Sequence, residues 1–221
     1  MKTRIKVCGI TNGEDAERAL SLGADYLGVI VYPKSPRAVA EENLPEVLAA
    51  IPRGKRVLVD VSTATDRLEH LLSFGFDACQ IHFDLEISMA TLAGWSGLAG
   101  PEALWLAPRL GPADRSFPQV IMEFAETILL DAYDPKAYGG TGKSGENWQR
   151  FVDCTLMYQH KNWMLAGGLN PDNIRHALEV TEAGMVDVNS GVECTPGRKD
   201  AEKLRRFVEE VERHDQEVGR T

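Results

Sequence analysis

Reactive side chains stand where two short apolar runs of the sequence end. Cys8 closes the run RIKVC, and Asp131 follows the apolar stretch TILL. A deprotonated thiol is a base, and a carboxyl group at the end of a buried run must find partners or shift its pKa. Cys8 and Asp131 are therefore candidate catalytic groups. Each also has a structural interpretation, because a free cysteine is most often a small buried hydrophobe and an aspartate often caps a loop.

Two further polar residues follow apolar runs. Arg37 comes after the proline-stiffened segment YPKSP, where a planar guanidinium would suit a carboxylate, although a solvated loop arginine is equally ordinary. His82 closes the run DACQIH. We interpret His82 as a hydrogen-bonded pocket residue rather than a metal ligand, and we expect no metal site.

Glycine and serine gather after two later apolar runs, in LAGGLN and DVNSGVE. Small residues let a backbone approach an anion, so these loops and the loop YGGTG predict a phosphate site; tight turns are the simpler alternative for each loop alone. The candidate phosphate-binding residues are Gly142, Gly167, Gly168, Asp187, Asn189, Ser190 and Gly191.

The elements that must position these residues alternate between strand and helix. Eight strands are predicted at Arg4–Cys8, Tyr26–Val31, Arg56–Val61, Asp77–His82, Ala103–Ala107, Thr127–Ala132, Asn162–Ala166 and Gly184–Asn189. Nearly continuous apolar strands that alternate with helices favour a parallel sheet. We therefore predict an α/β fold with one domain over residues 1–221, a closed (β/α)8 TIM barrel. Its active site would lie at the C-terminal ends of the strands.

An open doubly wound sheet is the alternative fold, but no G-x-G-x-x-G follows the first strand.

The helices are marked less clearly in the sequence than the strands. Asn170 and Pro171 predict the N-cap and first turn of a helix. The segment around QVIMEFA, between the fifth and sixth strands, has the weakest helical pattern.

The composition limits the possible partners. A net charge of −9 argues against a protein that binds nucleic acid. No run reaches the roughly 18–20 apolar residues that cross a bilayer, and the start of the chain does not resemble a signal peptide. Four scattered cysteines favour reduced thiols. We expect a cytoplasmic protein, with no membrane partner, that binds a small phosphorylated molecule; a monomer and a homodimer both remain open.

Five segments in order resemble one known family: KVCGIT, GADYLGVIVYPKSPR, ILLDAYDPKAYGGTGK, LAGGLNPDNI and VDVNSGVECTPGRKD. The family is phosphoribosylanthranilate isomerase, an enzyme of tryptophan biosynthesis. The resemblance implies a (β/α)8 barrel, no cofactor and no metal. It implies an Amadori rearrangement with Cys8 as general base and Asp131 as general acid. It also implies that Arg37 holds the anthranilate carboxylate and that the glycine loops hold the phosphate.

The middle strands depart from the family pattern. Leu58 and Asp60 stand in VLVDVS, Phe83 replaces a glycine, and the fifth strand around Leu106 lacks a basic residue often found there. We expect these positions to wall the anthranilate side of the pocket and to mark a divergent enzyme. Two alternatives follow: another phosphosugar isomerase or epimerase, or a non-catalytic barrel that binds a phosphorylated metabolite. The Cys8 and Asp131 pair favours catalysis.

Overall fold

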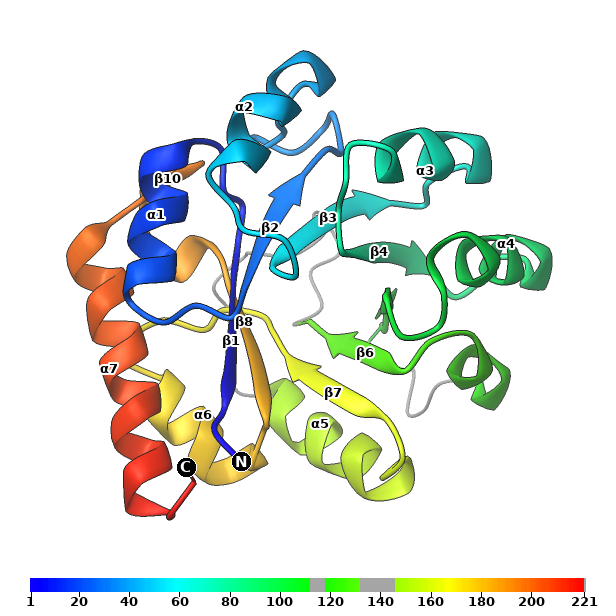
Figure 1. The fold of residues 1–221 in the computed structure, drawn as a ribbon. Helices are drawn as coiled ribbons and strands as arrows, with labels where there is room; N and C mark the ends of the chain where they lie inside the picture. Colours follow the sequence, from blue (N-terminus) through cyan, green and yellow to red (C-terminus); the bar gives the residue numbers. More distant parts are fainter. Residues whose placement is uncertain (112–117, 132–145, 221) are drawn as a thin grey trace.

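Eight parallel strands close into a barrel in the computed structural model, which describes residues 1–111, 118–131 and 146–220 (Figure 1). The strands are β1 (Arg4–Cys8), β2 (Tyr26–Ile30), β3 (Arg56–Val61), β4 (Ala78–Asp84), β5 (Leu104–Arg109), β6 (Thr127–Leu130), β7 (Asn162–Leu165) and β8 (Met185–Val188). Each strand pairs with the next, and β8 pairs with β1 to close the ring. The prediction of a closed (β/α)8 barrel is confirmed.

Helices surround the barrel and connect successive strands (Figure 1). They are α1 (Gly13–Ser21), α2 (Leu44–Ala49), α3 (Thr65–Leu72), α4 (Met89–Ala99), α5 (Glu146–Met157), α6 (Ile174–Thr181) and α7 (Ala201–Glu217). The weak pattern around QVIMEFA is a 3₁₀ segment, η2 (Gln119–Phe124), rather than an α-helix. A 3₁₀ turn η1 (Glu41–Asn43) leads into α2. No helix among the described residues is long and apolar enough to span a bilayer.

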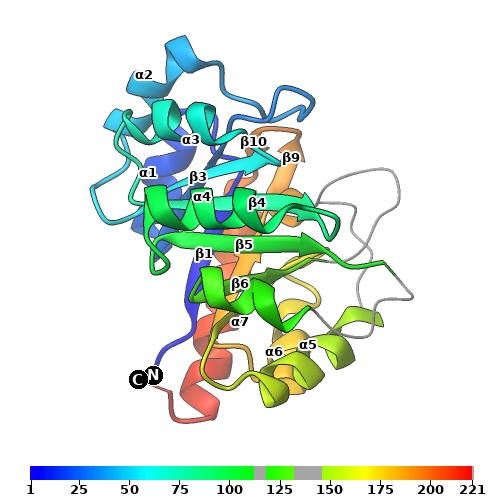
Figure 2. The same cartoon turned by 90° about the vertical axis from the view of Figure 1, so that its right-hand side faces the viewer.

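A small hairpin follows the barrel's last strand. The 3₁₀ turn η3 (Ser190–Val192) leads into β9 (Glu193–Thr195), which pairs antiparallel with β10 (Arg198–Lys199) before α7 begins. Figure 2 shows the arrows of β3, β4 and β5 pointing to one end of the barrel, while the two chain termini lie side by side at the other. The strand ends that carry the predicted site residues therefore share one face.

The start of α6 differs from its prediction. The helix begins at Ile174 with Asn173 at the N-cap, not at Asn170. Asn170 instead forms a tight turn: its side-chain oxygen accepts a hydrogen bond from the Asp172 N–H, and its own N–H donates to the Asn173 side chain. Such local side-chain bonds compete with a helical start, so the turn delays α6 by one turn.

Two apolar clusters follow from strand alternation. The cluster inside the barrel contains Cys8, Ile30, Val57, Val59, Ala78, Trp105, Ala107, Leu129, Met164, Ala166 and Met185. The larger cluster fills the layer between the barrel and its helices. Because successive side chains of a strand point to opposite faces, each strand contributes to both clusters.

Three of the four unusual residues of the middle strands face the helices. Leu58, Phe83 and Leu106 belong to the outer cluster, and the Phe83 ring packs edge-on against Trp95 of α4 with centroids 5.7 Å apart. Asp60 borders the pocket, but its carboxylate accepts hydrogen bonds from the Val61 N–H and the Thr63 hydroxyl. The expectation that these positions wall the pocket was wrong for Leu58, Phe83 and Leu106, because their side chains occupy the outward positions of their strands. Asp60 does belong to the pocket lining.

Candidate active site

A pocket opens at the C-terminal ends of the barrel strands. It encloses about 660 Å³ including its open mouth. Its lining includes Cys8, Ile30, Tyr32, Ser35, Arg37, Val59, Gln80, His82, Asp131, Ala166, Gly167, Gly168, Asp187 and Asn189. Eight predicted site residues therefore meet in one pocket. Ser190 and Gly191 lie in the adjoining turn η3, and Gly142 lies outside the described residues.

The candidate acid and base approach the pocket from strands that are not neighbours. Cys8 is the last residue of β1 and is 4% exposed, and burial raises the pKa of its thiol. The positive charge of Lys6 opposes that effect. Asp131 follows β6 directly and is only partly buried. A ligand in the pocket can thus contact a thiol and a carboxyl group on separate sides.

His82 is a hydrogen-bonded pocket residue. Its Nε2 lies 2.9 Å from the Gln80 side-chain amide, within hydrogen-bond distance. Burial and the positive charge of Lys6 lower the pKa of His82 to about 4. His82 is therefore uncharged at neutral pH and supplies shape and hydrogen bonding rather than charge.

The two glycine loops pack directly on each other. Gly167 and Gly168 have φ angles of 91° and 65°, in the left-handed region that favours glycine. A side-chain carbon on Gly191 would lie 1.9 Å from the backbone oxygen of Leu169, so no side chain fits there. The loops after β7 and β8 therefore form one continuous backbone surface at the edge of the pocket, as a phosphate cradle requires.

Substitution of Gly191 by alanine should damage both this surface and the fold. The added carbon must push the two loops apart, and overpacking of this kind typically costs about 1–3 kcal/mol. We expect a lower melting temperature and a raised KM. Gly184→Ala is the matched control, because a side-chain carbon there meets nothing within 4 Å. Equal melting temperatures and KM values for the two variants would contradict the close loop contact.

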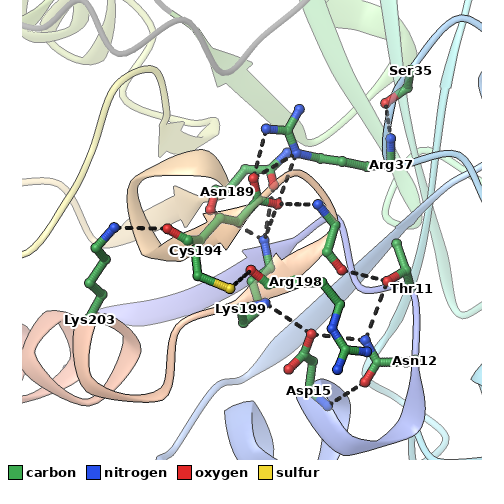
Figure 3. A network of polar contacts seen from close by, with 12 residues as sticks. Thr11, Asn12, Asp15, Ser35, Arg37, Asn189, Cys194, Arg198, Lys199 and Lys203 are labelled. Atoms are coloured by element: carbon green, nitrogen blue, oxygen red, sulfur yellow. Dashed lines mark hydrogen bonds and ion pairs between the residues drawn. The ribbon is translucent and has the colours of Figure 1, made fainter.

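Arg37 is held by a carboxylate from the C-terminal hairpin (Figure 3). Its Nε donates to the two Glu193 oxygens at 2.9 and 3.1 Å, and its Nη2 donates at 2.7 Å. Glu193 also accepts from the Lys199 ammonium and the Gly197 N–H, both at 3.1 Å. Although burial raises the pKa of Glu193, the bonds and charges of Arg37 and Lys199 lower it. A guanidinium has five N–H groups, so Arg37 can hold a second carboxylate while Glu193 fixes its orientation.

The hairpin itself is anchored to the start of α1 (Figure 3). The Lys199 N–H donates to Asp15 at 3.0 Å, and the Thr11 hydroxyl donates to the Gly197 carbonyl at 2.6 Å. Neither this hairpin nor the contacts of Glu193 were predicted from the sequence. The dipeptide Pro196–Gly197, with Gly197 at φ 79°, was the available turn signal.

Comparison with known proteins identifies a family. The model of the N-(5'-phosphoribosyl)anthranilate (PRA) isomerase family matches residues 5–210. The isomerase of Aquifex aeolicus is 38% identical over 208 residues, covering 93% of this chain and 96% of that protein. The isomerase of Neisseria meningitidis is 36% identical, covering 94% of this chain and 95% of that protein.

Solved structures give the same result. The isomerase structure from Thermotoga maritima has a TM-score of 0.78 at 30% identity, covering 95% of this chain and 98% of that chain. Another isomerase structure holds reduced 1-(o-carboxyphenylamino)-1-deoxyribulose 5-phosphate and has a TM-score of 0.73 at 28% identity, with the same coverage. This chain belongs to the N-(5'-phosphoribosyl)anthranilate isomerase family.

Proposed function

We propose that this chain converts N-(5-phosphoribosyl)anthranilate into 1-(2-carboxyphenylamino)-1-deoxyribulose 5-phosphate, a step of tryptophan biosynthesis. The observation that carries the proposal is that Cys8 and Asp131 line one pocket together with the glycine loop after β7. The loop after β8 adjoins them through Gly191. The reaction itself is inferred from the membership of this chain in the isomerase family.

The chemistry divides between the two groups. Asp131 donates a proton to the ring oxygen of the ribose, the bond from that oxygen to C1′ breaks, and a Schiff base forms. The Cys8 thiolate then removes the proton from C2′, which gives an enolamine that tautomerises to the ketone. The substrate and product are isomers, so no cofactor is consumed. Each group contributes roughly 10²–10⁴-fold, the usual range for general acid–base catalysis.

The remaining pocket residues bind the two charged ends of the substrate. Arg37, oriented by Glu193, holds the anthranilate carboxylate. Gly167, Gly168, Ser190 and Gly191 present backbone to the phosphate. The ligand bound in the related isomerase structure has the same two charged ends, which supports this division.

Asn189 and Asp187 are placed differently around the phosphate cradle. Asn189 shapes the loop after β8 through its bonds with Lys199 at 3.0 and 3.2 Å. Asp187 pairs with Lys6 at 2.8 Å. An ionised carboxylate repels a phosphate, so we assign Asp187 to the Lys6 pair rather than to direct phosphate binding.

The direct test is an assay with freshly generated phosphoribosylanthranilate, in which loss of the substrate fluorescence is followed. We expect turnover, and we expect the gene to rescue a tryptophan auxotroph. A chain that binds the reduced product but does not turn over would instead be a binding protein. A different phosphosugar substrate has less support, because three of the four altered residues of the middle strands face the helices. We also propose that the protein acts in the cytoplasm as a monomer or a homodimer. The Thermotoga maritima isomerase is dimeric.

Inorganic phosphate should compete with the substrate and raise the melting temperature. At a concentration ten times its Kd, a ligand stabilises the folded state by about 1.4 kcal/mol, or roughly 3–6 °C for a chain of this size. Phosphate also stabilises proteins generally by exclusion from their surface. The Gly191→Ala variant serves as the control, and its shift should be smaller. Equal shifts in both proteins would argue against a phosphate site on these loops.

A further inference from the structure

A lysine is buried inside the barrel beside the catalytic thiol. Lys6 and Cys8 are two residues apart on β1, so their side chains point to the same interior face. Lys6 is 0% exposed, and the Asp187 carboxylate, opposite it on β8, lies 2.8 Å from its ammonium. Burying an ammonium is unfavourable, and even a buried ion pair often contributes little to stability, so this position calls for an explanation beyond packing.

The same ammonium lies near the sulfur of Cys8. Its positive charge favours the negatively charged thiolate. On the neighbouring strand, Gly28 pairs with Cys8. A side-chain carbon on Gly28 would lie 2.9 Å from the Cys8 sulfur and 3.1 Å from the Lys6 ammonium. Glycine at this position therefore leaves room for both the ammonium and the sulfur.

The charges around the thiol act in opposite directions. Burial raises the pKa of Cys8, Lys6 opposes this most strongly, and the negative charge of Asp187 raises the pKa again. Lys199 from β10 lowers it more weakly. Burial would lower the pKa of Lys6, but Asp187 and Cys8 outweigh it, so Lys6 keeps its proton. The other ionisable residues that line the pocket are Tyr32, Arg37, Asp60, His82 and Asp131.

We propose that Lys6 is a positioning residue for Cys8: its buried ammonium stabilises the thiolate, while Asp187 holds Lys6 in place and competes with the sulfur for its charge. The consequence for turnover rests on the proposed role of Cys8 as the base. The consequence for the ionisation of the thiol does not. At neutral pH only a small fraction of the Cys8 side chains is thiolate. A change in the charges near the sulfur therefore changes the fraction of protein with an active base in proportion to the change in the thiolate-to-thiol ratio.

The first experiment measures the ionisation of Cys8 directly. Thiolate absorbance is recorded against pH, and the signal of the Cys8→Ala protein is subtracted. Lys6→Met should raise the pKa of Cys8, and Asp187→Asn should lower it, because it frees the ammonium for the sulfur. Loss of a close opposite charge changes the thiolate-to-thiol ratio at a given pH by roughly tenfold to a thousandfold. Lys161→Met, whose ammonium bonds the Ala125 carbonyl away from this pocket, should leave the titration unchanged.

The double variant Lys6→Met/Asp187→Asn keeps the test decisive if Lys6→Met alone does not fold. It removes both charges, so no unpaired carboxylate remains in the barrel. Its thiol should still titrate at a higher pH than in the unaltered protein, because Lys6 outweighs Asp187 at the sulfur. An unchanged titration in the double variant, or an upward shift in Asp187→Asn, would overturn the proposal.

The second experiment follows kcat/KM against pH. A thiolate base makes activity rise as pH passes the pKa of the thiol. In Lys6→Met that rise should move to higher pH, with kcat reduced at neutral pH and KM little changed. A lysine that only supported the fold would lower activity equally at every pH. If Cys8→Ala keeps its activity, the assigned base is wrong, whereas the titration of the thiol still reports on Lys6.

Discussion

Replacement of Cys8 by alanine should reduce kcat by roughly 10²–10⁴-fold and leave the affinity for the reduced product analogue nearly unchanged. The thiolate is the proposed acceptor of the C2′ proton, and alanine has no group that can take it. Binding is instead proposed to depend on Arg37 and the glycine loops, which the substitution does not change. Steady-state kinetics and titration calorimetry with the reduced product separate the two effects.

Cys79 provides the matched control for this experiment. It is fully buried on β4 in the cluster outside the barrel, and burial raises its thiol pKa to about 12. Cys79→Ala should lose some stability through the cavity it creates, but it should keep its kcat. Full turnover in Cys8→Ala, or an equal loss of kcat in Cys79→Ala, would remove the thiol at the end of β1 from the mechanism.

Much of this site could be predicted because it lies where apolar runs end. Short buried strands can be recognised from their apolar composition, and in a barrel their C-terminal ends meet at one face. Cys8, Asp131 and Gly167 are therefore located by sequence position alone. Their convergence in one pocket follows from the fold and needs no knowledge of individual side-chain contacts.

The ion pairs could not be predicted in the same way. Lys6 pairs with Asp187, and Arg37 pairs with Glu193, across 181 and 156 residues of sequence. Nothing local links such partners, and a lysine is expected at the surface unless a partner is known. Alternation along β1 was the one available signal, because it places Lys6 on the same face as Cys8.

The alternation of inward and outward side chains would also have corrected the expectation that Leu58 and Phe83 wall the pocket. His82 lines the pocket, so Phe83 must point away from it, and the outer position of Leu58 follows from Val59 inside the barrel. Differences from a family pattern bear on function only after each position has been assigned to the inner or outer face of its strand.

Asp131→Asn should lose most of kcat, again by roughly 10²–10⁴-fold, because an amide cannot deliver an acidic proton to the ribose ring oxygen. The substitution preserves size and shape at the residue that follows β6, so the melting temperature and the affinity for the reduced product should change little. Asp84→Asn is the control: that carboxylate ends β4 at the same barrel face, is about half exposed, and pairs with Arg109 at 3.6 Å outside the pocket lining.

The double variant Cys8→Ala/Asp131→Asn tests whether the two groups serve one reaction. Ring opening must precede proton removal from C2′, so a protein that lacks the acid gains little from an intact base. The losses should therefore fall well short of multiplying, as found for groups that act as a unit. Losses that multiply fully would indicate two independent contributions, and an active Asp131→Asn protein would show that the ring oxygen receives its proton from another group.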